Sequence, residues 1–363
     1  HKVQRTAPYT LRISRAAAPM AHSSIHCVGS DMAYWQIAAG SNQRSYDDRF
    51  LDHGIAFVGG TSQRETMRTV KIGDVVILKQ GMSRIRAVGR VVERDGQHSG
   101  DGGKDWLKDF DGWDLGGWCY VDWCVPSSPV VTSGLTRSTI QGVNQAHLIA
   151  EADRILATVP VKEPEDEPRK TDRVDDEVLT RGLIDFGLRP AAAEDLTVAL
   201  RRIRLLAGFY LGRPWHLTKE HEARTFLTVP LLLALGWAEQ RMQIELNVPG
   251  VGRADIACFR KPVRGYKDDP DECSIIIETK GLSEGLHYAT GQANRYAAEF
   301  PTCDVVIVTN GYCYKAYKRS ATDKSFPEKP TAYLNIRDPR TRYPLDPTNT
   351  DGALAVLKML IPT

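Results

Sequence analysis

The stretch SIIIETKG, residues 274–281, decides how this chain is interpreted. Three consecutive isoleucines are typical of a central strand that is buried on both faces. Because side chains alternate along a strand, Glu278 and Lys280 leave the same face at the end of this strand. Ionised groups in such a place are costly unless they are paired or bind a metal. The sequence therefore predicts a functional site at the end of this strand.

A second carboxylate comes from the stretch GRADIACF, residues 252–259, which reads as a neighbouring strand. Asp255 and Glu278, together with the backbone carbonyl of Thr279, supply the oxygen ligands that Mg²⁺ prefers. A lysine beside them can orient the attacking water, help to deprotonate it and offset phosphate charge. Two alternatives stay open: an exposed Glu278–Lys280 pair on an edge strand, and a plain ion pair between Asp255 and Arg253.

The C-terminal half changes its hydrophobic period several times. The patterns predict a helix closed by Gly236, three strands, a helix and two more strands. This order indicates a mixed α/β layer architecture with one crossover helix. The predicted elements are a helix over 221–236, strands over 242–248, 253–259 and 274–280, a helix over 284–300, and strands over 304–309 and 312–318.

The ordered series LLLALGW, GRADI, IIIETKG, GQANRYA and VVIVTNG resembles the PD-(D/E)XK nuclease superfamily. The longer match is to the nuclease module of type I restriction R subunits, over residues 216–320. The resemblance implies that Asp255 and Glu278 ligate the metal and that Lys280 is the catalytic lysine. Ala254 stands where the family pattern has proline, a residue that does no chemistry.

The resemblance also implies two supporting residues. Glu222 matches an acid in the first helix that positions water or a second metal, and Glu220 is its close rival. Gln292, with Tyr296 one turn later, matches a glutamine of the crossover helix that touches the active site. A surface glutamine and a packing tyrosine are the alternative. The implied cofactor is Mg²⁺, with Mn²⁺ as a substitute. A nucleotide cofactor is not expected, because the glycine-rich pieces match neither GxGxxG nor GxxxxGKS.

The N-terminal part reads as short strands, notably over 75–78, 85–92 and 118–125, which predicts a small β-barrel. The pieces YWQIAAG, KIGDVVIL, IRAVGRVV and CYVDWCVP resemble PUA superfamily barrels over residues 32–155, nearest to EVE-like domains. Members of that family bind modified bases, and a flipped base stacks on aromatic rings. Burial in the core is the alternative for each candidate, and an Asp-rich loop opposes phosphate binding. The candidate pocket residues are Trp35, Asn42, Trp106, Trp113, Trp118 and Tyr120.

Composition and length set the remaining limits. The chain has 363 residues, of which 42% are hydrophobic and 25% charged, with a net charge of +2. This excludes a wholly basic nucleic-acid binder but allows two or three globular domains. No apolar run is long enough to span a membrane. Seven cysteines without a CxxC pair argue against a zinc ribbon and for a reducing, cytoplasmic (prokaryotic) setting.

The predicted organisation is an α+β multidomain chain. Its parts are an extension (1–31), a base-reading domain (32–156), a charged linker (157–176), a helical spacer (177–215) and a nuclease domain (216–363). The predicted function is a modification-dependent DNA restriction endonuclease. It would act on double-stranded DNA that carries a modified base, as a homodimer and without a membrane. The alternative is a non-catalytic binder of modified RNA or DNA with a structural nuclease fold.

Overall fold

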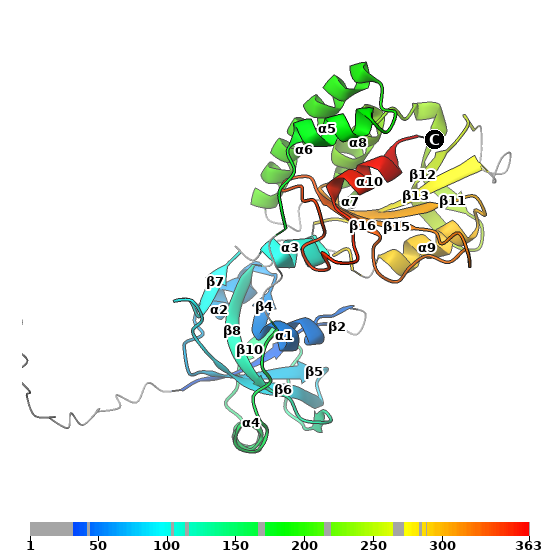
Figure 1. Cartoon of the computed structure of the whole chain (residues 1–363). Coiled ribbons are helices and arrows are strands. Elements are labelled where there is room, and N and C mark those ends of the chain that lie inside the picture. Colours follow the sequence, from blue (N-terminus) through cyan, green and yellow to red (C-terminus); the bar gives the residue numbers. More distant parts are fainter. Residues whose placement is uncertain are drawn as a thin grey trace, which may run out of the picture. The chain divides into compact units, whose positions relative to one another are not determined.

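The computed structural model describes residues 32–362 except 42–43, 103–104, 113–115, 166–170, 214–218, 264–271, 283–284 and 288. The predicted N-terminal extension lies outside the described residues. The described chain is an α+β protein built on two mixed β-sheets, as Figure 1 shows. This confirms the predicted α+β class with a mixed C-terminal sheet.

The N-terminal sheet curls into a half-barrel of eight strands (Figure 1). The order is β10-β1-β5-β6-β8-β4, with β7 beside β8 and β9 beside β6. Only β1 and β5 pair in parallel. A small hairpin of β2 (Gly40–Ser41) and β3 (Arg44–Ser45) follows β1. The eight strands are β1 (Tyr34–Ala38), β4 (Ile55–Val58), β5 (Val75–Gln80), β6 (Arg84–Val91), β7 (Ser99–Asp101), β8 (Gly117–Cys124), β9 (Val130–Val131) and β10 (Ile140–Gly142).

Strand β5 shows why this sheet has a core on each face. Its side chains alternate, so Val76 and Leu78 join one hydrophobic cluster while Val75 and Ile77 join another. Helix α4 (Ala146–Thr158) covers the second cluster. The sequence predicts a helix over 140–156, whereas residues 140–142 form strand β10 and the helix begins six residues later. The other helices of this part are α1 (Asp47–His53), α2 (Thr61–Met67) and α3 (Asp105–Asp111).

The C-terminal sheet has six strands in the order β11-β12-β13-β14-β15-β16. Strands β13 and β14 are parallel and are joined through helix α9 (Thr290–Ala298), as the predicted crossover requires. The other pairs are antiparallel. The sequence does not predict β16, which has only four residues and follows a polar loop. The strands are β11 (Met242–Val248), β12 (Gly252–Phe259), β13 (Cys273–Thr279), β14 (Val305–Thr309), β15 (Cys313–Lys318) and β16 (Ala332–Asn335).

The helix predicted over 221–236 is three consecutive helical pieces. These are α7 (Glu220–Ala223), a π-helical segment η2 (Arg224–Thr228) and α8 (Val229–Ala234). Pro230 lacks an N–H and stands at the start of α8. A π segment just ahead of a proline accommodates the missing donor, and such segments occur often at functional sites.

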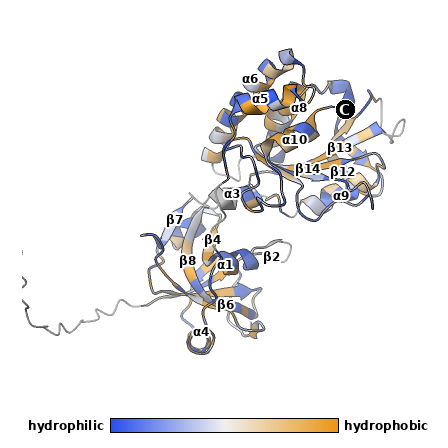
Figure 2. Ribbon diagram, viewed as in Figure 1, coloured by the Kyte–Doolittle hydropathy of each residue, from blue (hydrophilic) through white to orange (hydrophobic). Residues whose placement is uncertain are grey.

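The helices predicted as a spacer belong to the core of the C-terminal part. Helices α5 (Asp176–Ile184) and α6 (Pro190–Gly212) bury Leu179, Leu196 and Ile203 in the same hydrophobic cluster as the six-stranded sheet. Helix α10 (Ala353–Leu360), which the sequence does not predict, joins this cluster. Figure 2 shows α8, α10 and the central strands as largely hydrophobic. Among the described helices, none combines the length and the apolar character that a membrane span needs.

Much of the predicted linker is held by backbone hydrogen bonds. Lys162 N donates to Trp123 O in the N-terminal part, at 2.7 Å. Val174 N donates to Pro339 O in the C-terminal part, at 2.9 Å. Residues 166–170 lie outside the described part. The charged composition of this stretch therefore does not prevent its described ends from packing.

Candidate active site

Strand register brings Asp255 and Glu278 together. Strands β12 and β13 are antiparallel, with Ile256 opposite Ile277, so Asp255 lies opposite the end of β13. Asp255 Oδ2 accepts hydrogen bonds from Thr279 N at 2.6 Å and from Thr279 Oγ1 at 2.8 Å. Asp255 is buried, and both strands bury most of their residues. The predicted central, doubly buried strand is therefore present, and it is not an edge strand.

Glu278 has one carboxylate oxygen engaged and one that lacks a partner. The residue is 1% exposed. Its Oε1 accepts from Lys280 Nζ at 2.6 Å, whereas Oε2 is buried and makes no hydrogen bond within the described part of the chain. Burial, followed by the charge of Asp255, raises the pKa of Glu278 to about 7, although Lys280 opposes this shift. An oxygen in this state is costly unless something binds it.

Lys280 keeps its positive charge. Burial lowers its pKa, but the carboxylates of Glu278, Glu220 and Asp255 outweigh burial, and the net pKa is raised. Its Nζ lies 3.8 Å from Glu220 Oε2. An ammonium group of this kind can donate hydrogen bonds and offset negative charge, but it is a poor proton acceptor near neutral pH.

Arg224 is a member of the site that the sequence interpretation missed. It is buried in the π segment η2, and its Nη1 donates to Asp255 Oδ1 at 2.7 Å. Its Nη2 donates to Glu245 Oε1, also at 2.7 Å. Glu245 has a positive φ of 52°, a conformation that costs energy in a residue other than glycine. The available signal was the spacing of Glu220 and Arg224, which lie four residues apart and therefore on one side of the first helix.

The first helix presents Glu220, and not Glu222, to this cluster. Glu220 lies 3.8 Å from both Lys280 Nζ and Arg224 Nη1. Glu222 Oε2 accepts from Lys219 N at 3.0 Å, and its Oε1 pairs with Arg213 at 3.2 Å. The Lys219 backbone bond, followed by Arg213, lowers the pKa of Glu222. Glu222 therefore closes the start of its own helix.

Gln292 is engaged with its neighbour on α9. Its Nε2 donates to the hydroxyl of Tyr296 at 3.4 Å, and Tyr296 is buried. Helix α9 packs against β12, β13 and β14. Gln292 therefore belongs to the helix that covers the site strands, where its described hydrogen bond is to Tyr296.

The donor set fits a hard divalent cation in part. In the described residues, no group of three or more His, Cys, Asp or Glu side chains surrounds a common point as a metal cage would. Mg²⁺ does not need such a cage, because one or two carboxylates with water and substrate phosphate suffice. Glu278 Oε2 has both lone pairs available, and Asp255 Oδ1 accepts only from Arg224 among the described bonds. These two oxygens are the candidates for holding the metal, and Thr279 contributes its N–H and hydroxyl to Asp255.

The aromatic residues expected to form a base pocket have structural contacts where they are described. Trp35 Nε1 donates to the buried Asp74 at 2.8 Å. Trp118 is 3% exposed and donates to Gly102 O at 2.8 Å, with its ring against Tyr120. Asn42, Trp113 and the side chain of Trp106 lie outside the described residues. The structure therefore brings Trp118 and Tyr120 together in the core.

Two cavities open beside the end of β1. One of about 180 Å³ is lined by aromatic rings, by Gln63 and by the backbone of Gly59 and Gly60. The other, of about 690 Å³, lies beside Lys79 and Arg137 and shares Ala38, Ala39 and Gly40 with the first. Aromatic walls with a few polar groups are typical of sites for planar ligands. The rings of the smaller cavity belong to Tyr46, Phe50 and Phe57.

Helix α3 docks on the C-terminal sheet through a second cluster of buried charges, here called the docking cluster. Asp109 Oδ1 accepts from Tyr333 OH at 2.8 Å, and Lys315 Nζ donates to Phe110 O. Asp111 accepts from His287 N at 2.6 Å and from the Tyr46 hydroxyl. Burial lowers the pKa of Lys315 to about 8. The docking cluster connects helix α3 with the sheet that carries the site.

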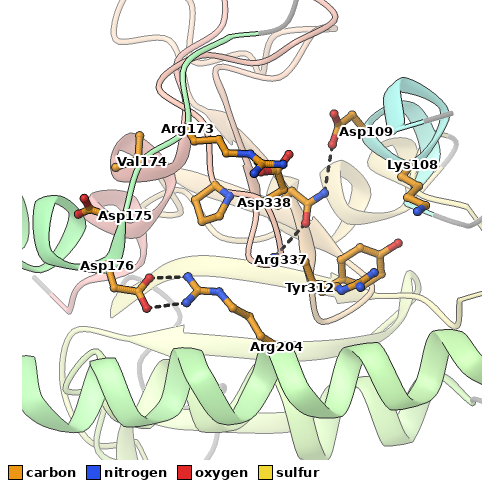
Figure 3. Close-up of a pocket in the computed structure, with 12 residues that line it drawn as sticks. Lys108, Asp109, Arg173, Val174, Asp175, Asp176, Arg204, Tyr312, Arg337 and Asp338 are labelled. Carbon is orange, nitrogen blue, oxygen red and sulfur yellow. Dashed lines mark hydrogen bonds and ion pairs between the residues drawn. The ribbon is translucent and has the colours of Figure 1, made fainter. Parts of the chain in front are cut away.

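A polar cavity of about 580 Å³ lies next to Asp109 (Figure 3). Arg204 faces Asp176 through two hydrogen bonds of 2.5 Å, and Arg173 pairs with Asp338 at 2.7 Å. These acidic and basic side chains in the wall of the cavity pair with each other. Among the residues described in its wall, the cavity therefore lacks a buried, unpartnered carboxylate oxygen of the kind found in the Asp255–Glu278 cluster.

No protein-family model matches this chain, and no curated protein matches it.

Proposed function

We propose that the chain is a metal-dependent DNA endonuclease of the PD-(D/E)XK type. The observation that carries this proposal is Glu278 Oε2, a buried carboxylate oxygen without a hydrogen-bond partner in the described chain, beside Asp255 and Lys280. A structural ion cluster would satisfy that oxygen, whereas a metal site leaves it available. The order of the elements supports the same proposal, because strand, strand, crossover helix and strand follow the predicted series.

Each residue then has a definite task. Glu278 and Asp255 would hold Mg²⁺, which when bound supplies charge stabilisation on the phosphate and activates water. Lys280 donates hydrogen bonds to a phosphate oxygen or to the water, since its raised pKa keeps it charged. Arg224 fixes the orientation of Asp255 through Oδ1, while Thr279 fixes it through Oδ2. Arg224 is thus a positioning residue.

The N-terminal half-barrel is proposed as the reader of a modified base. The support is the pair of cavities at the end of β1, of which the smaller has aromatic walls. Stacking on such rings and hydrogen bonding at the base edge repay the cost of extrusion. The candidate rings shift to Tyr46, Phe50 and Phe57 because they line this cavity and the three earlier candidates do not. All six residues also pack in or against the core of the half-barrel, the earlier three being Trp35, Trp118 and Tyr120.

One experiment tests the activity and the preference for modified DNA together. A plasmid is prepared in unmodified, methylated, hydroxymethylated and glucosylated forms, and each form is incubated with the protein and Mg²⁺. Cleavage of a modified form, its loss with EDTA and its loss in Lys280→Ala are expected. Lys261→Ala is the matched control, because Lys261 is an exposed lysine paired with Glu272. Equal cleavage by Lys280→Ala would refute the site.

A non-catalytic binder of modified nucleic acid is the second candidate. The observation in its favour is that both oxygens of Asp255 already accept hydrogen bonds, from Arg224 and from Thr279. Such a protein would bind one plasmid form selectively without cutting it in Mg²⁺ or Mn²⁺. A binding assay alongside the digestion separates the two candidates, because selective binding without cleavage by the unmodified chain is expected only of the binder.

A further inference from the structure

Helix α6 has an outer face that is apolar and exposed. Its inner face buries Leu196, Leu200 and Ile203 in the core. On the outer face, Leu205 is 73% exposed and Val198 is 66% exposed. Side chains of this kind on one long helix are typical of a surface that contacts another protein.

The charges beside this apolar line are arranged in two pairs. Along the helix, Glu194 and Asp195 lie one turn before Val198, and Arg201 and Arg202 lie one turn after it. All four charged residues are exposed, and none of them makes an ion pair with another described residue. At 100° per residue, all four lie within about 60° of Val198 on the helix surface. The outer face therefore carries acids at one end, bases at the other and an apolar residue between them.

We infer that this face binds a second copy of the chain, with the two α6 helices antiparallel and the two-fold axis at Val198. The two-fold rotation reverses the direction of the second helix. Residues on one side of the apolar line therefore face residues on the same side of that line in the second copy. Glu194 then faces Arg201 of the second copy, and Asp195 faces Arg202. The two valines meet on the axis, and Leu205 packs toward Ala191 of the second copy. Each contact occurs twice, as an isologous interface requires.

The mixed charge selects this occupant over others. A membrane surface attracts a helix whose polar face is basic, and phosphate backbones attract arginines without acids beside them. Glu194 and Asp195 oppose both. A second α6 in antiparallel orientation is the partner that matches acids with bases at every position.

The size of the face determines how strong the association is. A contact between two single helices is smaller than the roughly 1,600 Å² of a standard interface. We therefore expect a dimer that forms in the micromolar range and tightens when both copies bind one DNA molecule. The inference does not depend on the proposed function. If that function holds, the dimer supplies the two sites that a double-strand cut needs.

Charge reversal provides the test. Sedimentation velocity from about 1 to 100 µM should show a monomer–dimer equilibrium for the unmodified chain. One variant carries Arg201→Glu and Arg202→Glu, and a second carries Glu194→Arg and Asp195→Arg. Each alone should stay monomeric, because like charges then meet. An equimolar mixture should dimerise again, because every pair is once more opposite in sign. Thermal melting verifies that both variants fold.

A cysteine on the axis tests the register. Val198→Cys should form a covalent dimer on mild oxidation, whereas Val178→Cys, an exposed residue of α5, should not. The unmodified chain under the same oxidant is the background. A monomer at every concentration, a mixture that stays monomeric, or equal cross-linking at both positions would each overturn the inference. None of these outcomes bears on nuclease activity, so a failure of the dimer and a failure of the proposed function are distinguishable.

Discussion

The site cluster of Asp255, Glu278 and Lys280 and the docking cluster around α3 both bury charges on the six-stranded sheet, but they differ in how these charges are satisfied. In the docking cluster, Asp109 and Asp111 accept from tyrosine and backbone donors, and Lys315 donates to a backbone carbonyl. In the site cluster, Glu278 Oε2 has no described partner and the pKa of Glu278 is raised. Buried charge alone therefore does not mark function; the site cluster differs by combining an unpartnered carboxylate oxygen with a raised pKa and a neighbouring second carboxylate.

The largest expected effect is on cleavage. Glu278→Gln and Asp255→Asn should each reduce DNA cutting on the order of 10³-fold, because each removes a charged oxygen proposed to hold the metal. The DNA affinity should change little. Glu272→Gln, in a residue that pairs with Lys261 near the surface, is the control and should cut normally. Normal cutting by Glu278→Gln would mean that the site cluster, like the docking cluster, has only a structural role.

Substitutions in the docking cluster should instead lower the stability of the folded protein. Asp111→Ala removes the acceptor for His287 N and the Tyr46 hydroxyl, and should lower the free energy of unfolding by about 3–5 kcal/mol. Asp101→Ala, which breaks an exposed pair with Arg68, should cost about 0–1 kcal/mol. Chemical denaturation measures both. If Asp111→Ala abolishes DNA cutting at a temperature where the variant is still folded, the contrast between the two clusters is wrong.

A smaller effect is expected in the pH dependence of stability, which should reveal the raised pKa of Glu278 in the site cluster. The folded pKa of Glu278, about 7, lies above its ordinary value of 4.5. Protonated Glu278 therefore favours the folded state, and this contribution is present below pH 4.5 and lost as the pH rises to about 7. Relative to Glu278→Gln in EDTA, the unmodified chain should lose on the order of 1–3 kcal/mol across that window. Denaturation at a series of pH values measures the difference, and a constant difference would contradict the raised pKa.

The smallest effect is expected at Asp74, a buried carboxylate of the N-terminal half-barrel. It accepts from Ala33 N, Lys71 N and Trp35 Nε1. Trp35→Phe leaves two of these bonds in place and should cost about 1 kcal/mol of stability. Selective binding of a modified base should be unaffected, as measured by fluorescence anisotropy. A selective loss of that binding would return Trp35 to the base pocket.

The sequence predicts β13 and β14 most directly, because their hydrophobic runs are uninterrupted. The run Ile275–Ile277 indicates a central strand on its own, and the structure has it. Strand β16 is too short to give such a signal. The docking cluster was not predictable, since it joins Asp109 and Tyr333 across 224 positions of the chain.

Within the site, the sequence predicts the residues that lie together on β13 but not those that other elements contribute. The pairing of Glu278 with Lys280 follows from a spacing of two residues. The choice of Glu220 over Glu222 depends on how α7 and η2 turn toward β13, which a period alone does not determine. Arg224 escaped notice for the same reason, because its partners Asp255 and Glu245 come from two other strands.

Metal binding tests the central claim most directly. Mn²⁺ is titrated calorimetrically at pH 8 into the unmodified chain, Glu278→Gln and Asp255→Asn, each with and without a short DNA duplex. We predict saturable binding to the unmodified chain, strengthened by DNA, that is lost or greatly weakened in both variants. Equal Mn²⁺ binding by all three proteins, or no binding to the unmodified chain even with DNA, would contradict the claim that the site cluster holds a catalytic metal.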